Sequence, residues 1–242
     1  MREARPRRIF EAVKDLLFPR RCPVCDGIVT PMGEKICTSC LPVLKPVRAP
    51  WCMVCGKGLA KEGELCEECK NGKLHFFRRA RALYDYPSVA LSIYRFKYGA
   101  RREYKDFFGE EMAKYLGDFI LSTGAQALIP IPLHKRRMRK RGYNQAAELS
   151  KVLGAKLGLP TYENLLFRVK NTKPQKQQNS KERQNNLKKA FLVRKNDVEL
   201  KTIILIDDIY TTGTTADEAA KALTEAGIPD VYVVTLAGGM EA

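Results

Sequence analysis

The chain has 242 residues, of which 45% are hydrophobic, and it carries a formal charge of +16 at pH 7. This apolar fraction is enough for a packed core, which excludes wholesale disorder, and no apolar run reaches the ~20 residues that a membrane-spanning helix needs. The length fits one full domain together with a small one, and we expect no membrane insertion.

The positive charge is concentrated in the middle of the chain. Residues 95–195 carry 24 basic and 8 acidic groups, whereas residues 196–242 carry 2 basic and 9 acidic groups. A field of this sign attracts nucleic acids, polyphosphates or acidic membrane surfaces, and charge alone does not choose among them. A solvated basic face is the simplest alternative to a binding surface.

The first 19 residues are basic, but they lack the apolar core and the small-residue cleavage site of a signal peptide. Their acidic residues also argue against a transit peptide. Apolar side chains at helical spacing predict a short amphipathic helix, docked on the body of the protein, at residues 1–19: Ile9, Phe10, Val13, Leu16 and Leu17. We therefore expect a cytoplasmic protein.

All eight cysteines lie between residues 22 and 69, in four Cys-x-x-Cys pairs. Each pair can direct two thiolates at one metal ion, and two pairs complete the tetrahedron that zinc prefers. A redox motif needs a single pair, so four pairs favour two structural zinc sites. The simplest pairing follows chain order, with Cys22, Cys25, Cys37 and Cys40 in one site and Cys52, Cys55, Cys66 and Cys69 in the other.

The spacing also leaves an interleaved cross-brace open. Either pairing gives closed four-cysteine sites, which build structure because they have no position for a substrate. Gly27 and Gly56 follow the first and third pairs, where a knuckle turn favours a residue with positive φ. We expect residues 20–75 to form a small double zinc-ribbon domain whose folding energy comes from the metal.

From about residue 80 the pattern becomes an alternation of strands and helices. Strands are predicted at 81–86, 126–132, 201–207 and 230–238, and helices at 88–98, 103–121, 143–158 and 216–227. This alternation predicts an α/β domain over residues 76–242, with a mostly parallel sheet covered on both faces. Residues 172–186 are polar without apolar periodicity and are predicted to form a loop.

Two adjacent acids, Asp207 and Asp208, end the strand predicted at 201–207, and a loop rich in threonine follows them: Thr211, Thr212, Gly213, Thr214 and Thr215. Backbone N–H groups of such a loop, at a helix N-terminus, bind an anion. Ribose 5-phosphate offers a phosphate to the loop and hydroxyls to the acids. The alternative is an ordinary capped turn, which two acids at a strand end make less attractive.

The stretch IILIDDIYTTGTT resembles the PRPP-binding signature of type I phosphoribosyltransferases, except that Tyr210 stands where a small aliphatic residue is usual. The resemblance implies that Asp207 and Asp208 hold the ribose 2′ and 3′ hydroxyls and that the loop from Thr211 to Thr215 holds the 5′-phosphate. Three further motifs are similar to the ComF competence-protein family: IPIPL, RGYNQ and the T-x-x-Q…R-x-x-N pattern of Thr172, Gln175, Arg183 and Asn186.

That family joins N-terminal zinc knuckles to a phosphoribosyltransferase-like domain. The resemblance implies a PRPP-binding protein of natural transformation, the uptake of single-stranded DNA, with other DNA-uptake proteins as partners. It places Leu133, His134 and Lys135 in a pyrophosphate loop, and it places Thr172, Gln175 and Arg183 in a flexible catalytic loop. Catalysis would release pyrophosphate from PRPP with Mg²⁺ bound, but a fold supplies no acceptor, so an active enzyme and a PRPP-binding protein both fit.

Residues 135–141 place six basic groups in seven positions. The family resemblance implies that they capture diphosphate. The alternative is a track for single-stranded DNA, with Phe96, Tyr98 and Tyr143 as stacking surfaces for bases. The phosphate contacts of such a track would come from Arg136, Arg137, Arg139, Lys140 and Arg141. A zinc-ribbon protein that binds nucleic acid without catalysis is a third reading.

Overall fold

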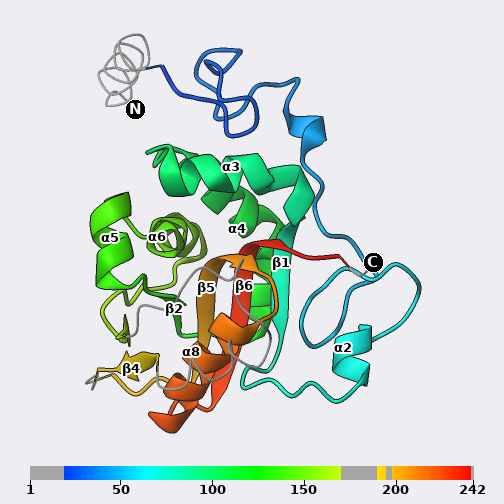
Figure 1. Cartoon of the computed structure of the whole chain (residues 1–242), viewed down its shortest axis with the longest axis vertical. Helices are drawn as coiled ribbons and strands as arrows, with labels where there is room; N and C mark the ends of the chain where they lie inside the picture. The colour runs from blue at the N-terminus through cyan, green and yellow to red at the C-terminus, as the bar shows by residue number, and fades with distance from the viewer. Residues whose placement is uncertain (1–18, 170–189, 195–197, 241–242) are drawn as a thin grey trace, which may run out of the picture.

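The computed structural model describes residues 19–169, 190–194 and 198–240 (Figure 1). The helix expected over residues 1–19 therefore lies, apart from its last residue, outside the described part of the chain. The flexible-loop candidates Thr172, Gln175 and Arg183 also lie outside it.

Four parallel strands form the central sheet, in the order β1-β6-β5-β2. They are β1 (Ala80–Asp85), β2 (Ala127–Pro130), β5 (Thr202–Tyr210) and β6 (Asp230–Gly238). Each lies where a strand was predicted, and the parallel pairing confirms the predicted fold class. Because all four strands run the same way, their carboxyl ends meet at one edge of the sheet, which is where ligands of such sheets bind.

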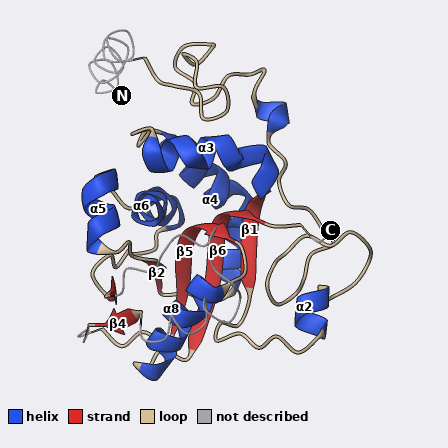
Figure 2. Cartoon of the chain, in the orientation of Figure 1, coloured by secondary structure: helices blue, strands red, loops and turns tan. Residues whose placement is uncertain are grey.

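Alternate residues of the central strands face opposite sides of the sheet, as the two-residue period of a strand requires. Ile204 and Ile206 share a core with helices α3 (Tyr86–Tyr98), α4 (Tyr104–Ser122) and α6 (Gln145–Leu157). Ile203 and Leu205 share the opposite core with α8 (Thr214–Glu225). The four predicted helices are thus confirmed, and they cover both faces (Figure 2).

The remaining elements are short, and sequence analysis did not find them. Helix α5 (Lys135–Arg141) is too basic to show an apolar period, and it ends at Gly142, whose φ is +81°. Strands β3 (Leu166–Arg168) and β4 (Phe191–Val193) pair antiparallel on either side of the loop predicted at 172–186. The 3-10 turn η1 (Leu41–Val43) lies between the second and third cysteine pairs. Helix α2 (Glu67–Lys70) begins directly after Cys66 and contains Cys69.

The cysteine-rich segment divides into two loops, a first loop at residues 20–44 and a second loop at residues 45–75. Val29 and Ile36 of the first loop belong to the core that contains α3, α4 and α6. Leu59 of the second loop belongs to the core that contains α8. Each loop therefore shares a core with the α/β domain, so the burial of apolar side chains contributes to the folding of each loop.

The second loop also covers the outer edge of β1. Its backbone pairs with β1 through Val47 N–H to Leu83 O (2.8 Å) and Asp85 N–H to Lys45 O (2.9 Å). Pairing of this kind satisfies the N–H and C=O groups that an edge strand otherwise leaves exposed. Among the described residues, no helix combines the length and the apolarity that crossing a bilayer requires.

Candidate functional site

Asp207 and Asp208 lie side by side at the carboxyl end of β5. Asp208 is only 8% exposed, and its carboxylate forms an ion pair with Lys97 Nζ at 2.8 Å. The backbone N–H of Asp208 donates to Asp207 Oδ1 at 2.8 Å. Sequence analysis missed Lys97, because a lysine in the last turn of a helix is ordinary helix-end chemistry.

Asp207 has an unusual protonation equilibrium. Burial, reinforced by the Asp208 carboxylate and opposed by Lys97 and Arg168, raises the pKa of Asp207 to about 7. Arg168 in β3 is itself deeply placed, and burial lowers its pKa to about 10. The strand end is thus less negative than two bare carboxylates would be, which reduces its repulsion of a phosphate.

The threonine-rich loop joins β5 to α8, and Gly213 takes a backbone conformation that only glycine allows here. Gly213 has a φ of +76°, and a Cβ at this position would lie 2.3 Å from the Tyr210 hydroxyl, so only glycine fits. As the N-cap of α8, Gly213 offers no side chain to the first N–H groups of the helix. Those groups, with the hydroxyls of Thr212 and Thr214 at 2.8 Å from each other, form a donor set suited to phosphate.

The basic helix α5 follows β2, which pairs directly with β5. His134 is the N-cap of α5, and its Nδ1 accepts from the Arg136 N–H at 3.2 Å. Leu133, His134 and Lys135 therefore form the entry to a helix at the carboxyl edge of the sheet. Burial and the nearby Arg141 lower the pKa of Arg137, whereas Arg136, Arg139 and Lys140 are exposed.

The sequence RGYNQ ties the end of α3 to the start of α6. The Tyr143 hydroxyl and Gln145 Nε2 both donate to the carbonyl of Phe96, the latter at 3.1 Å. Asn144 caps α6 and donates to Ile131 O at 3.0 Å. Phe96 directly precedes Lys97, so the motif holds the backbone that brings Lys97 to Asp208.

This packing overturns part of the predicted stacking surface. Phe96 is fully buried and Tyr143 is 8% exposed, so neither ring is accessible to a base. Tyr98 is exposed, but the Arg141 guanidinium lies over its ring at 4.9 Å and also donates to its hydroxyl. Phe96 and Tyr143 are therefore core residues, and Tyr98 holds the Arg141 side chain of α5.

The eight cysteines form two tetrads in chain order, and the sulfur atoms within each tetrad lie within 4.8 Å of one another. Sulfur–sulfur distances of 4.0 Å for Cys25–Cys37 and 3.6 Å for Cys55–Cys66 fit the edge of a zinc tetrahedron. That edge is about 3.8 Å when each Zn–S bond is about 2.3 Å. The residues therefore fit zinc in chain-order pairing, and the cross-brace alternative is wrong.

The first cysteine of each tetrad has a lowered thiol pKa, which favours its thiolate form. Burial opposes ionisation of Cys22 and Cys52, but backbone N–H groups outweigh it and lower their pKa values to about 7 and about 6. Burial raises the pKa of Cys40 and of Cys69 to about 12. Zinc binds thiolates, so loading the remaining thiols would release protons.

The positive φ expected after the first pair falls on a different residue. Asp26 has a φ of +62° and Gly56 has one of +70°, while Gly27 has none, so the expectation for Gly27 is wrong. Aspartate tolerates this conformation better than most residues. Here its carboxylate accepts from Arg101 (2.7 and 3.1 Å) and from the Tyr104 hydroxyl (2.8 Å), which ties the first loop to α4 and the turn before it.

The second tetrad is connected to the threonine-rich loop by side chains that the sequence did not single out. His75, whose side chain is 1% exposed, lies between Cys69 Sγ (3.8 Å from Nε2) and the Asp217 carboxylate (2.9 Å from Nδ1). Lys73 Nζ donates to Thr212 O at 2.7 Å. The segment from Lys73 to His75 thus contacts a cysteine of the second tetrad, the threonine-rich loop and the first turn of α8.

Tyr210, which stands where the PRPP-binding signature usually has a small aliphatic residue, also packs against the segment around His75. It is 6% exposed, and its ring meets Phe77 edge-on at 6.2 Å between centroids. Phe77 in turn stacks on His75 at 4.5 Å. A large residue at position 210 therefore packs the loop against the segment that follows the second tetrad.

Two family models match the chain. A double zinc ribbon domain matches residues 13–70, and a phosphoribosyl transferase domain matches residues 139–242. These matches cover the cysteine tetrads and the strand–loop–helix site respectively.

Curated relatives align with most of the chain. Competence protein F of Haemophilus influenzae is 30% identical over 229 residues, which cover 91% of this chain and 97% of that protein. Competence protein ComFC of Bacillus subtilis is 32% identical over 207 residues, or 80% of each chain. The DNA utilization protein YhgH of Salmonella typhimurium is 29% identical over 226 residues, 90% of this chain and 96% of that one.

Among solved structures, the adenine phosphoribosyltransferase of Leishmania tarentolae covers 65% of this chain and 78% of its own, at 12% identity and a TM-score of 0.27. A TM-score this low does not establish a shared fold.

Proposed function

The chain belongs to the ComF family of competence proteins, and on that premise we propose that its phosphoribosyltransferase-like domain binds PRPP in a cytoplasmic protein of DNA uptake. One observation carries the proposal. The end of β5 offers two carboxylates, and the loop that follows offers the N–H groups of a helix start.

The division of labour follows from chemistry. Asp207 and Asp208 accept hydrogen bonds from the ribose hydroxyls, and the loop from Thr211 to Thr215 surrounds the 5′-phosphate. The entry to α5, Leu133 to Lys135, faces the diphosphate. The hard carboxylate oxygens of Asp207 and Asp208 would suit Mg²⁺ bound together with PRPP, and the ion would supply positive charge to offset the diphosphate.

Calorimetry with PRPP and Mg²⁺ tests the assignment. The double variant Asp207→Asn/Asp208→Asn keeps two oxygen acceptors but loses their charge, which weakens each hydrogen bond by about 1 kcal/mol, so its affinity falls about 30-fold. Asp118→Asn, on the exposed face of α4, is the matched control and binds normally. Unchanged PRPP affinity in the double variant would refute the placement. Adding candidate acceptors and measuring pyrophosphate then separates an enzyme from a binding protein.

We also propose contact with single-stranded DNA, because α5 exposes Arg136, Arg139 and Lys140 on a strongly basic chain. Such contact weakens steeply with salt, since each phosphate contact releases counterions. Replacing these three residues with Ala lowers the slope of log K against log salt by about 0.7 for each lost contact. Arg137 is left in place because it is half-buried. If the triple variant keeps the parent's salt slope for DNA binding but loses PRPP affinity, α5 serves the diphosphate alone.

A further inference from the structure

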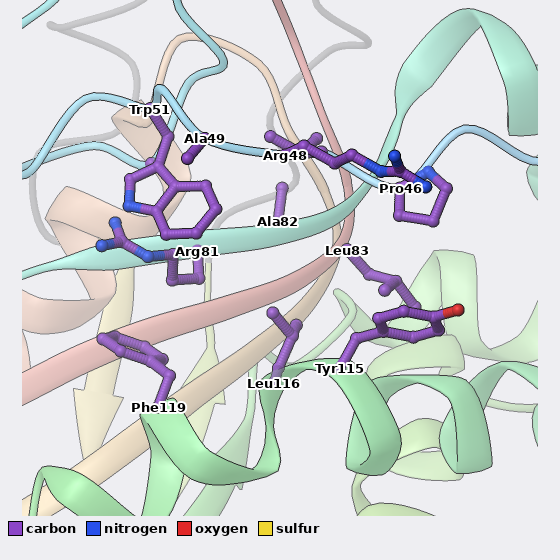
Figure 3. Close-up of a pocket in the computed structure, with 12 residues that line it drawn as sticks. Pro46, Arg48, Ala49, Trp51, Arg81, Ala82, Leu83, Tyr115, Leu116 and Phe119 are labelled. Carbon is purple, nitrogen blue, oxygen red and sulfur yellow. The ribbon is translucent and has the colours of Figure 1, made fainter. Parts of the chain in front are cut away.

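A pocket separate from the phosphate loop lies between the second loop, β1 and α4 (Figure 3). Its volume is about 340 Å³, and Trp51, Arg81, Tyr115 and Phe119 are among its lining residues. Figure 3 shows Trp51 on one side of the pocket and Tyr115, with Leu83 next to it, on the other. Because β1 and β2 are opposite edges of the sheet, the pocket lies away from α5.

Aromatic rings and cations alternate around this pocket. The Arg81 guanidinium lies over the Trp51 ring at 4.7 Å and over the Phe119 ring at 5.2 Å. Arg81 is 9% exposed and is held by the carbonyl of Ala80 at 3.1 Å, so its position is set by the fold. Lys114 does not line the pocket, but its Nζ lies over the Tyr115 ring at 4.9 Å from the ring centroid.

Arg48 adds a further cation at the exposed side of the pocket, on the segment that covers the β1 edge. Tyr115 is 49% exposed and lines the pocket, so the part of its ring that Lys114 does not cover is accessible to a ligand. A site with apolar aromatic walls and cations beside them suits a ligand that is planar and also anionic. Nucleotides have both properties.

The size of the pocket narrows the ligand class further. A volume of about 340 Å³ lies at the small end of the ~300–1,000 Å³ range of ligand sites, which suits one base with its sugar. Bases of a duplex are stacked and paired, whereas those of a single strand splay out and stack on aromatic side chains. We infer that this pocket receives one unstacked base of single-stranded DNA, with Arg48 at the adjoining phosphate. The inference rests on the DNA contact proposed above and adds a site for it.

Trp51 gives a direct readout, because it is the only tryptophan in the chain. The full-length protein is titrated with oligothymidylate of about 12 nucleotides, which is within the usual site size of such proteins. The expected result is saturable quenching of Trp51 emission. An abasic strand of the same length binds through its phosphates but leaves the emission unchanged, and a duplex of the same length does not quench.

Two variants sharpen the test. Tyr115→Ala removes one stacking surface and weakens oligothymidylate binding about 5- to 100-fold, with little change for the abasic strand. Tyr94→Ala is the matched control, since Tyr94 is an exposed tyrosine on α3 (61% exposed, against 49% for Tyr115) that does not line the pocket. Because the Tyr115 side chain is half exposed, we expect the variant to fold as the parent does, and the melting temperature of each variant checks this.

Each contrary outcome has a distinct meaning. DNA binding with unchanged Trp51 emission, or equal quenching by the abasic strand, overturns the pocket assignment and leaves the DNA contact standing. Equal loss of binding in Tyr115→Ala and Tyr94→Ala overturns it as well. Failure of every strand to bind at low salt defeats the DNA contact itself, and the pocket assignment falls with it.

Discussion

At the scale of single residues, the two carboxylates of β5 differ in their surroundings although they are adjacent in sequence. Asp208 faces a cation from α3, Lys97, at 2.8 Å. For Asp207 burial dominates, and its pKa rises to about 7. The ligand-free protein therefore holds one paired carboxylate and one that titrates near neutral pH, an arrangement that is costly for the fold and useful for binding hydroxyl groups.

The raised pKa of Asp207 has a defined sign for stability. Its folded pKa of about 7 exceeds the ordinary value of 3.8, so the folded protein holds an extra proton between these values, and stability falls as pH rises through that window. Asp207→Asn removes the penalty, so the variant is more stable than the parent at pH 8 and gains much less at pH 5. The full shift corresponds to ~4 kcal/mol, which partial exposure reduces to about 1–3 kcal/mol.

Urea denaturation at pH 5 and pH 8 measures this difference. Asp118→Asn is the control, because Asp118 is exposed on α4 and its replacement should leave the pH dependence of stability as in the parent. A gain of equal size at both pH values would contradict the titration near pH 7. The stabilised Asp207→Asn variant is also expected to bind PRPP weakly, so stability and binding oppose each other at this residue.

At the scale of secondary-structure elements, short-range patterns were predictable and long-range contacts were not. The sheet strands contain short continuous apolar runs and the four long helices carry apolar residues at helical spacing, which is why their sequence positions matched. Helix α5 and the strands β3 and β4 are short or lack such a period. Lys97 and His75 act through partners 111 and 142 residues away, at Asp208 and Asp217, and no local pattern in one sequence reports such pairs.

The contact of Lys73 with the phosphate loop gives a prediction at this scale. Lys73 Nζ donates to the Thr212 carbonyl and also pairs with Glu68, so it fixes the loop relative to helix α2. Lys73→Met removes that donor, and we expect PRPP affinity to fall about 3- to 10-fold, the effect of a hydrogen bond worth about 1 kcal/mol. Lys70→Met, on the exposed side of α2, is the matched control.

Calorimetry with PRPP and, separately, with pyrophosphate locates the effect of Lys73→Met. A loop that holds the 5′-phosphate should lose affinity for PRPP while pyrophosphate binding stays the same. Zinc content should stay the same as well, because no cysteine is changed. Equal PRPP affinity in Lys73→Met and Lys70→Met would show that the loop holds its conformation without the second cysteine loop.

At the scale of the whole molecule, the two cysteine loops are built into opposite faces of the α/β domain. The first loop is tied through Asp26 to Arg101 and Tyr104, and Val24 O accepts from Arg95 in α3 at 2.8 Å. The second loop pairs with β1 and reaches α8 through His75. Cysteine spacing alone indicated two zinc sites, but how the sites relate to the sheet depends on contacts between distant segments.

Because of this arrangement, we expect loss of metal from the second tetrad, but not from the first, to affect PRPP binding directly. Metal analysis of protein purified without chelator should find two zinc ions per chain, and Cys22→Ser and Cys52→Ser should each retain one. Both variants should melt at a lower temperature, because each loop shares a core with the α/β domain. Only Cys52→Ser should also lose PRPP affinity well below its melting temperature, because only the second loop contacts Thr212 and Asp217. Equal loss of affinity in both variants would mean that zinc acts on the site through general stability, and a parent protein with fewer than two zinc ions would contradict the two-site assignment.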